Sequence, residues 1–152
     1  MKSKFLHDNR GSGASDAPFM VMATVILMGL VIGVSLSVLH YWECKNTANQ
    51  AEYLLNKIEN GVERVSIEGA GAIRVIEGNV PGKCGGCTME INSTENSVNV
   101  TCPECFRGGK KFDNLNIHPD SIAEIPPGVH NISIKKIKTQ GGSAINISCL
   151  DC

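Results

Sequence analysis

The stretch "APFMVMATVILMGLVIGVSLSVLHYW", residues 17–42, contains no Asp, Glu, Lys or Arg. A helix of about 20 apolar residues spans the hydrocarbon core of a bilayer, so this stretch is long enough to cross a membrane. It is apolar on all sides, and the rest of the 152-residue chain is too short to enclose it as a buried core helix. Tyr41 and Trp42 close the stretch, as aromatic residues often do at a membrane interface. We therefore predict one membrane-spanning helix.

The charges around this stretch predict its orientation. Lys2, Lys4 and Arg10 precede it, against the two acids Asp8 and Asp16. Because positive charges flanking a membrane helix favour the cytoplasmic side, the N-terminus is expected in the cytoplasm and the chain after Trp42 outside, at the cell surface.

Four N-glycosylation sequons agree with that orientation, since all of them fall in the predicted outer part. They begin at Asn92, Asn99, Asn131 and Asn146. Each asparagine is expected on the solvent side of a predicted strand, so glycosylation is a prediction of the sequence.

The helical pattern continues beyond the membrane stretch. Asp16 is suited to cap the start of the helix. The segment "ECKNTANQAEYLLNKIENG" places apolar residues at helical spacing (Ala51, Leu55, Ile58 and Val62 in the sequence). Asn60-Gly61 has the composition of a helix stop. We therefore predict one helix over residues 12–61, apolar all round at first and amphipathic later.

After Gly61 the pattern changes to the period of two that is typical of strands. "RVSI" and "AIRVI" are predicted as short strands on either side of residues 69–71, and "TMEIN" and "SVNVT" as a hairpin across residues 93–96. A last hairpin is expected to pair Ile132 and Ile134 with Ile145 and Ile147 across Gly141-Gly142. Residues 106–129 are expected to be mostly loop, with a short strand or two. The fold class is therefore α+β: one long N-terminal helix, then a small antiparallel β-rich head over residues 62–152.

The N-terminal order of features resembles a known family. Arg10-Gly11, then Ser12-Gly-Ala-Ser-Asp16, then a retained apolar helix and a β head resemble type IV pilins, especially archaeal pilin-like proteins with class III signal peptides. The resemblance implies a leader of residues 1–11, removed by a prepilin peptidase between Gly11 and Ser12, with a cut after Gly13 as the alternative. Asp16 then becomes the fifth mature residue, where most bacterial pilins carry Glu.

The resemblance also implies a role for that acid in assembly. An unpaired carboxylate is costly to bury, so in a filament Asp16 would pair with the new N-terminal amine of a neighbouring subunit and fix the register. The implied partners are identical or homologous subunits, the peptidase with the pilus assembly machinery, and the membrane.

Six of the seven cysteines form three Cys-x-x-Cys pairs, at 84/87, 102/105 and 149/152, and the seventh is Cys44. The first two pairs bracket the predicted hairpin over residues 88–101, which brings Cys102 back near Cys87. Two interpretations stay open for Cys84, Cys87, Cys102 and Cys105: a zinc-ribbon-like site, or disulfides that cross between the pairs. A bridge inside one pair closes a small ring and is less expected. A redox role is the weakest interpretation. Cys44, Cys149 and Cys152 are candidates for further disulfides.

Two classes of function follow. The first is a structural subunit, pilin-like or pseudopilin-like, of an archaeal type IV pilus-like surface filament. The alternative is a monomeric single-pass membrane-anchored ectodomain whose zinc-ribbon-like or disulfide-bonded head binds a partner. The net charge of −1 gives no electrostatic basis for nucleic-acid binding. We find no constellation of nucleophile, base and acid, so we do not expect an enzyme. Zinc is the one cofactor that the cysteines suggest.

Overall fold

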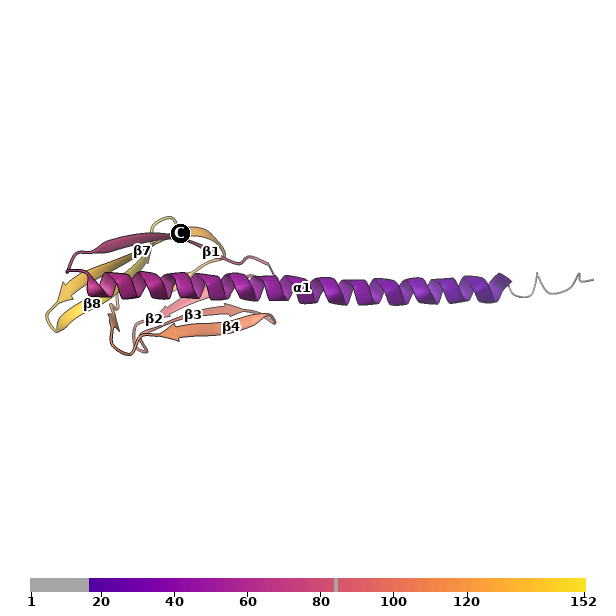
Figure 1. The fold of residues 1–152 in the computed structure, drawn as a ribbon, viewed down its shortest axis with the longest axis horizontal. Coiled ribbons are helices and arrows are strands. Elements are labelled where there is room, and N and C mark those ends of the chain that lie inside the picture. Colours follow the sequence, from indigo (N-terminus) through magenta and orange to yellow (C-terminus); the bar gives the residue numbers. More distant parts are fainter. Residues whose placement is uncertain (1–16, 84) are drawn as a thin grey trace, which may run out of the picture. The chain divides into compact units, whose positions relative to one another are not determined.

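The computed structural model describes residues 17–83 and 85–152. The predicted cleavage site at Gly11 and Ser12, the acid Asp16 and the cysteine Cys84 therefore lie outside the described residues. The chain divides into two units, one up to His40 and one from Tyr41 to Cys152. Helix α1 (Ala17–Ile67) contributes to both (Figure 1).

Eight strands follow the helix, all in the second unit. They are β1 (Ile73–Val80), β2 (Thr88–Asn92), β3 (Ser97–Cys102), β4 (Phe106–Lys111), β5 (Asn116–Ile117), β6 (Glu124–Ile125), β7 (Gly128–Thr139) and β8 (Gly142–Cys149). One sheet has the order β1-β7-β8-β5 and the other the order β4-β3-β2-β6. All pairings are antiparallel except that of β5 with β8. The predicted α+β class, a long N-terminal helix and an antiparallel-rich β head, is confirmed.

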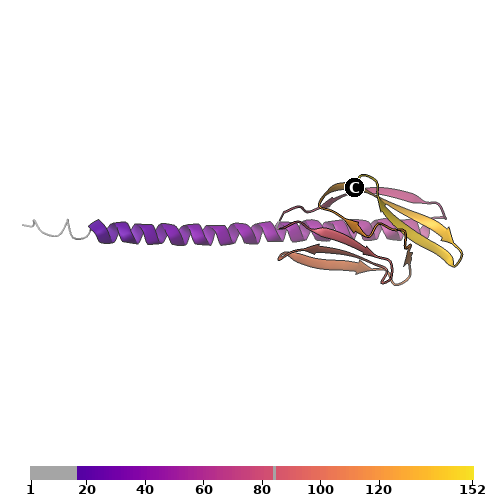
Figure 2. The ribbon, with the colours of Figure 1, turned by 180° about the vertical axis from the view of Figure 1, so that it is seen from behind.

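The two sheets and the second part of α1 share one core. In Figure 1, β1 and β7 lie above the second part of α1, and β2, β3 and β4 lie below it; Figure 2 shows the same arrangement from behind. From α1 the core takes Ala51, Leu54, Leu55, Ile58, Val62 and Val65, each at most 3% exposed. The helical spacing predicted for Ala51, Leu55, Ile58 and Val62 thus marks a buried face, and at about 25 cal/mol per Å² its burial is a main source of the head's stability.

Both predicted hairpins form. Met89 pairs with Val100 and Ile91 with Val98, all buried, so the alternation over β2 and β3 gave the correct register. In the second hairpin Ile134 pairs with Ile147, so only one of the two expected isoleucine pairs forms. Ile132 instead lies opposite Cys149, and Ile145 lies opposite Lys136.

The predicted end of the helix is wrong. α1 continues through Asn60-Gly61 to Ile67, so "RVSI" is helical and is not a strand. A side chain at Gly61 would bring its Cβ to 2.7 Å from Ile134 Cδ1, and one at Gly78 would come equally close to Leu54 Cδ1. These glycines let the helix and the β1-β7-β8-β5 sheet approach closely, which is a packing role and not a helix stop.

The true end of α1 is stabilised by a residue far along the chain. Lys136 on β7 donates from its Nζ to the carbonyl oxygens of Ser66 (2.6 Å) and Glu68 (2.7 Å). Such a cation satisfies the last carbonyls of a helix and complements its negative end. The region predicted as mostly loop, residues 106–129, is also more ordered than expected: it contains β4, β5 and β6. Its polar, glycine-rich β4 sequence "FRGGKK" lacks the apolar alternation that marks a strand, because β4 is an edge strand.

Candidate functional site

The first candidate site is the apolar part of α1. From Phe19 to Leu39 its large apolar side chains are between 47% and 73% exposed. Among the described residues, α1 is the one helix long and apolar enough to cross a membrane. Its hydroxyl groups are satisfied within the helix: Thr24 donates to Met20 O (3.0 Å), Ser35 to Val31 O (2.7 Å) and Ser37 to Gly33 O (3.0 Å). The segment therefore presents almost no unsatisfied polar group to an apolar surrounding.

The second candidate site is the cysteine cluster at the end of the first hairpin. Thr88 pairs with Thr101. Cys87, just before β2, and Cys102, the last residue of β3, therefore face each other. They form a disulfide with a Cα–Cα distance of 4.1 Å, and both are buried. The expectations that Cys102 returns to Cys87, and that a bridge crosses between the pairs, hold for these two residues.

The turn between β3 and β4 carries a second bridge next to the first. In Cys102-Pro-Glu-Cys105 the N–H of Cys105 donates to Cys102 O (3.2 Å), and Glu104 takes a left-handed φ of 64°. The tight turn sends the two sulfurs to different partners, Cys102 to Cys87 and Cys105 to Cys44 on α1. Cys44 lies seven residues before Ala51, so both lie on the same helix face and Cys44 faces the head.

The zinc-ribbon interpretation does not fit this arrangement. A ribbon site needs four free thiolates, and Cys87, Cys102 and Cys105 are all bridged. Three of the four predicted ligands are therefore oxidised, and the fourth, Cys84, lies outside the described residues. Cys44, a candidate for a further disulfide, has its partner within the same chain.

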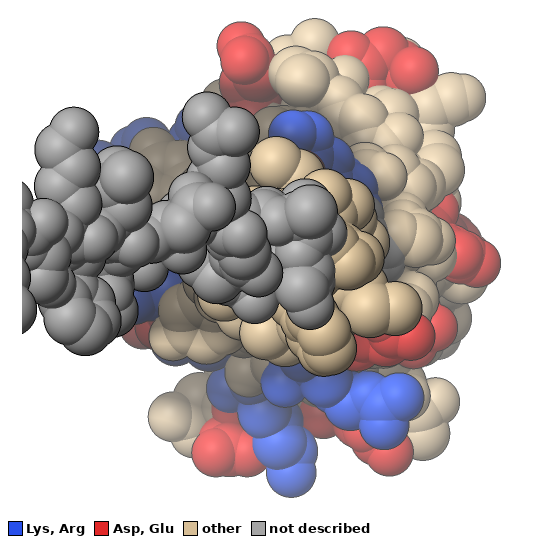
Figure 3. All heavy atoms as spheres, turned by 90° about the vertical axis from the view of Figure 1, so that its right-hand side faces the viewer, with Lys and Arg blue, Asp and Glu red and all other residues tan. Residues whose placement is uncertain are grey.

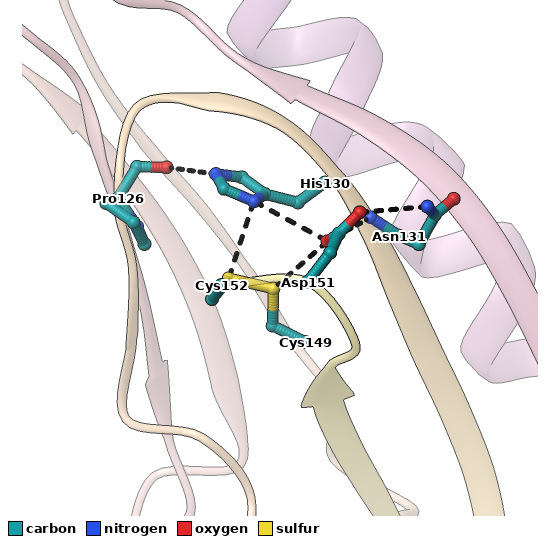
Figure 4. Close-up of a disulfide and its surroundings, with 6 residues drawn as sticks. All are labelled: Pro126, His130, Asn131, Cys149, Asp151 and Cys152. Atoms are coloured by element: carbon teal, nitrogen blue, oxygen red, sulfur yellow. Dashed lines mark hydrogen bonds and ion pairs between the residues drawn. A yellow bond between two sulfur atoms is a disulfide. The ribbon is translucent and has the colours of Figure 1, made fainter.

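The third candidate site is the last cysteine pair, drawn in Figure 4. Cys149 and Cys152 form a disulfide inside their own Cys-x-x-Cys segment, contrary to the expectation that bridges cross between pairs. The physical reason is that β8 ends at Cys149 and the chain bends at Leu150, which leaves Cys152 with its Cα 5.7 Å from that of Cys149. Leu150 N donates to Asn131 O (2.8 Å) and Asn131 N to Asp151 Oδ1 (2.8 Å), which returns Cys152 toward Cys149.

His130 at the start of β7 lies against this disulfide, and only 11% of its side chain is exposed. Its Nε2 lies 3.1 Å from Pro126 O. A carbonyl can only accept, so Nε2 carries the proton in the neutral ring and Nδ1 keeps a lone pair. That Nδ1 lies 3.5 Å from Cys152 Sγ (Figure 4). Gly128 leaves room for the ring, since its φ is +142° and a Cβ there would lie 3.0 Å from His130 Nε2.

Asp151 completes the cluster at its exposed side. Its Oδ2 accepts from Asn131 Nδ2 (2.9 Å), and its Oδ1 lies 3.6 Å from His130 Nδ1. The backbone hydrogen bond from Asn131 is the main cause that lowers the pKa of Asp151 below its ordinary value. The ligand atoms of His130, Cys149 and Cys152 lie within 4.8 Å of one another, close enough to hold a metal ion. In the disulfide form the two sulfurs are not thiolates, so zinc is not established.

The four sequon asparagines are partly or fully exposed. Three of them use their side chains locally, and Asn99 does so by donating from Nδ2 to Ser97 Oγ (3.4 Å). Asn92 Oδ1 accepts from the N–H groups of Thr94 and Glu95 and shapes the hairpin turn. Asn131 donates from Nδ2 to Asp151, so a glycan there would compete with that bond. Glycosylation stays a prediction.

The head carries charged side chains of both signs. Acidic and basic side chains both appear around the face shown in Figure 3. Several are paired with each other, such as Lys110 with Glu59 (2.8 Å) and Arg74 with Glu68 (3.1 Å).

Sequence reasoning left the partner of Cys44 open and missed His130, and a signal existed for each. The heptad separation of Cys44 from Ala51 and Ile58 places it on the buried face, which favours a bridge to the head. The β7–β8 hairpin places His130 next to the last cysteine pair once the register is known. Comparisons with protein-family models, with curated proteins and with solved structures find no match to this chain.

Proposed function

We propose that this chain is a pilin-like structural subunit of a type IV pilus-like surface filament, assembled by packing of the N-terminal helices. The observation that carries the proposal is the exposed apolar face of α1 from Phe19 to Leu39. The helix presents an uncharged surface whose hydroxyls are already satisfied, and such a surface is stable in lipid or against copies of itself.

The architecture of the head supports the same proposal. The buried face of α1 and the Cys44–Cys105 bridge join the head to the helix at several points. A subunit held in a filament by its helix benefits from a head that cannot detach from that helix. The order of Gly11, Ser12 and Asp16 before the helix supports the proposal as well. It resembles a class III signal peptide, in which the apolar segment stays on the mature protein.

The mature N-terminus tests the proposal. We expect the chain, expressed with a prepilin peptidase in a host that assembles such filaments, to begin at Ser12 when measured by mass spectrometry. A product that begins at Met1 contradicts a filament subunit and leaves the membrane-anchored monomer as the function. A product that is cut beyond Trp42 has lost the apolar segment and contradicts both functions.

The acid gives a second, independent measurement. Asp16→Ala is expected to leave membrane insertion intact and to reduce filament yield, since the carboxylate serves contacts between subunits. Asp16→Glu keeps the charge and is the matched control. Wild-type yield from Asp16→Ala shows that the acid only caps the helix.

A further inference from the structure

We propose that the C-terminal disulfide covers a metal site, which a dithiol reductant opens. In the reduced protein, Cys149, Cys152 and His130 Nδ1 bind one divalent ion of the zinc class. This proposal is independent of the filament function.

The geometry of three donors carries the proposal. The two sulfurs and the imidazole nitrogen already lie within 4.8 Å of one another. Metal sites of this composition hold zinc with two thiolates and one neutral imidazole, leaving a fourth position for water or a carboxylate. Asp151 Oδ1 lies 3.6 Å from both Cys149 Sγ and His130 Nδ1 and faces that position (Figure 4).

The histidine is oriented as a metal ligand would be. A metal-binding imidazole usually donates its other N–H to a backbone carbonyl or a carboxylate, which fixes the tautomer and the ring plane. His130 has this arrangement, with Nε2–H on Pro126 O and the Nδ1 lone pair toward Cys152. The alternative is that the ring only packs over the bridge, and the experiment below separates the two.

The donors stay in place when the bridge opens, because backbone contacts hold them. Cys149 is the last residue of β8 and pairs with Ile132, which lies two residues after His130 on β7. The tail is held by the bonds from Leu150 N to Asn131 O and from Asn131 N to Asp151 Oδ1. Neither contact requires the sulfur–sulfur bond.

The reaction balances as ordinary thiol–disulfide exchange. A thiolate of the dithiol attacks one sulfur of the Cys149–Cys152 bridge, and a mixed disulfide forms. The second thiol of the reductant then attacks the mixed disulfide. This step releases the second protein thiol, and the reductant leaves as a cyclic disulfide. Cys149 and Cys152 have then gained two electrons and two protons, and the ion replaces those protons on binding.

Exposure favours this bridge over the other two. Cys152 is exposed and Cys149 half-buried, whereas Cys87 and Cys102 are at most 2% exposed. Cys44, Cys105 and Cys149 are all half-buried, and Cys105 and Cys149 both pack against the core, so the exposed Cys152 distinguishes the C-terminal bridge from Cys44–Cys105. A small dithiol therefore reaches the C-terminal bridge first.

The test uses the full chain in detergent on a Cys84→Ser background, which removes the one cysteine outside the three bridges. Brief treatment with dithiothreitol is followed by its removal under argon and by titration with Co(II), a spectroscopic substitute for zinc. We expect about one Co(II) per chain, with thiolate charge-transfer and tetrahedral ligand-field absorption that zinc abolishes. The untreated protein should show no such absorption.

Two variants and a thiol map make the result decisive. Cys149→Ser with Cys152→Ser should abolish binding, and His130→Ala should weaken it by roughly tenfold or more. His118→Ala is the matched control, because His118 lies 3.5 Å from Asp120 in a similar His–Asp pair without cysteines. Alkylation and mass spectrometry should find the new thiols at Cys149 and Cys152.

Three results overturn the proposal. One is no Co(II) binding by protein whose Cys149 and Cys152 are shown to be free and whose circular dichroism is native. Another is unchanged affinity in His130→Ala, which leaves the ring as packing only. The third is opening of Cys44–Cys105 or Cys87–Cys102 before the C-terminal bridge.

Discussion

The two parts of helix α1 differ in exposure although they share one backbone and similar apolar residues. Between Phe19 and Leu39 the large apolar side chains are at least 47% exposed, whereas the core-facing residues between Ala51 and Val65 are at most 3% exposed. The second part is amphipathic and is covered by two sheets. The first part is apolar on every side, so packing against one face of it would leave its other apolar faces exposed. The difference teaches that hydrophobicity alone does not decide burial, because the angular distribution of apolar residues decides what can cover them.

The largest expected effect comes from releasing the buried part of α1 from the head. Cys44→Ser with Cys105→Ser opens a loop with a sequence separation of 61 residues. In the chain-entropy treatment such a loop stabilises a fold by about 4 kcal/mol. We expect a loss of about that size in the free energy of unfolding, measured by urea denaturation in detergent under oxidising conditions.

The last bridge is the control for this measurement. Cys149→Ser with Cys152→Ser opens a separation of 3 residues, for which the same treatment gives about 1.6 kcal/mol. Equal losses of unfolding free energy in the two double variants would show that the Cys44–Cys105 bridge stabilises the head no more than the short C-terminal bridge does.

A matched pair of isoleucines tests the contrast directly. Ile58 is 1% exposed and Ile26 is 63% exposed, and both lie on α1. Ile58→Ala should cost about 3.5 kcal/mol, because it removes buried apolar contacts and leaves a cavity. Ile26→Ala should change the unfolding of the head by less than about 0.5 kcal/mol. Similar losses at both positions, in the same denaturation experiment, would remove the distinction between the two parts.

A charge in the first part should separate insertion from folding. Ile26→Arg is expected to cost about 3 kcal/mol of membrane insertion, measured with a microsomal insertion assay, since Arg is strongly disfavoured at the centre of a membrane helix. The head should keep its native circular dichroism. Ile67→Arg is the control, because Ile67 is 85% exposed at the end of α1, and it should change neither quantity. Normal insertion of Ile26→Arg is incompatible with residues 17–42 as the spanning segment.

The smallest effect concerns the close approach at Gly61. A Cβ there meets Ile134 Cδ1 at 2.7 Å, and overpacking of this kind costs about 1–3 kcal/mol. Alanine recovers about 1 kcal/mol of helix propensity, so Gly61→Ala should destabilise the head by about 1 kcal/mol net. Gly69→Ala, where a Cβ meets no atom within 4 Å, is the control. A gain in melting temperature for Gly61→Ala would show that the contact with Ile134 does not exclude a side chain at this position.

The sequence by itself determined the features that depend on neighbouring residues. The apolar stretch over residues 17–42, the buried spacing of Ala51, Leu55 and Ile58, and the pairing of Met89 with Val100 all follow from periods of 3.6 or two. Such periods are local, because each residue's face is fixed by its distance along one element. The return of Cys102 to Cys87 is local in the same sense, since a hairpin closes on itself.

Only the tertiary structure decided the features that join distant segments. Lys136 stabilises the end of α1 from a strand about seventy residues away in the sequence. Gly61, which together with Asn60 has the composition of a helix stop, instead packs closely against Ile134. The pairing of Cys105 with Cys44, and the position of His130 beside Cys152, depend on how the sheets pack against the helix and against the returning tail. Several partners were chemically equivalent for each of these groups. The choice among them was made by the three-dimensional positions of the backbone, which no local period encodes.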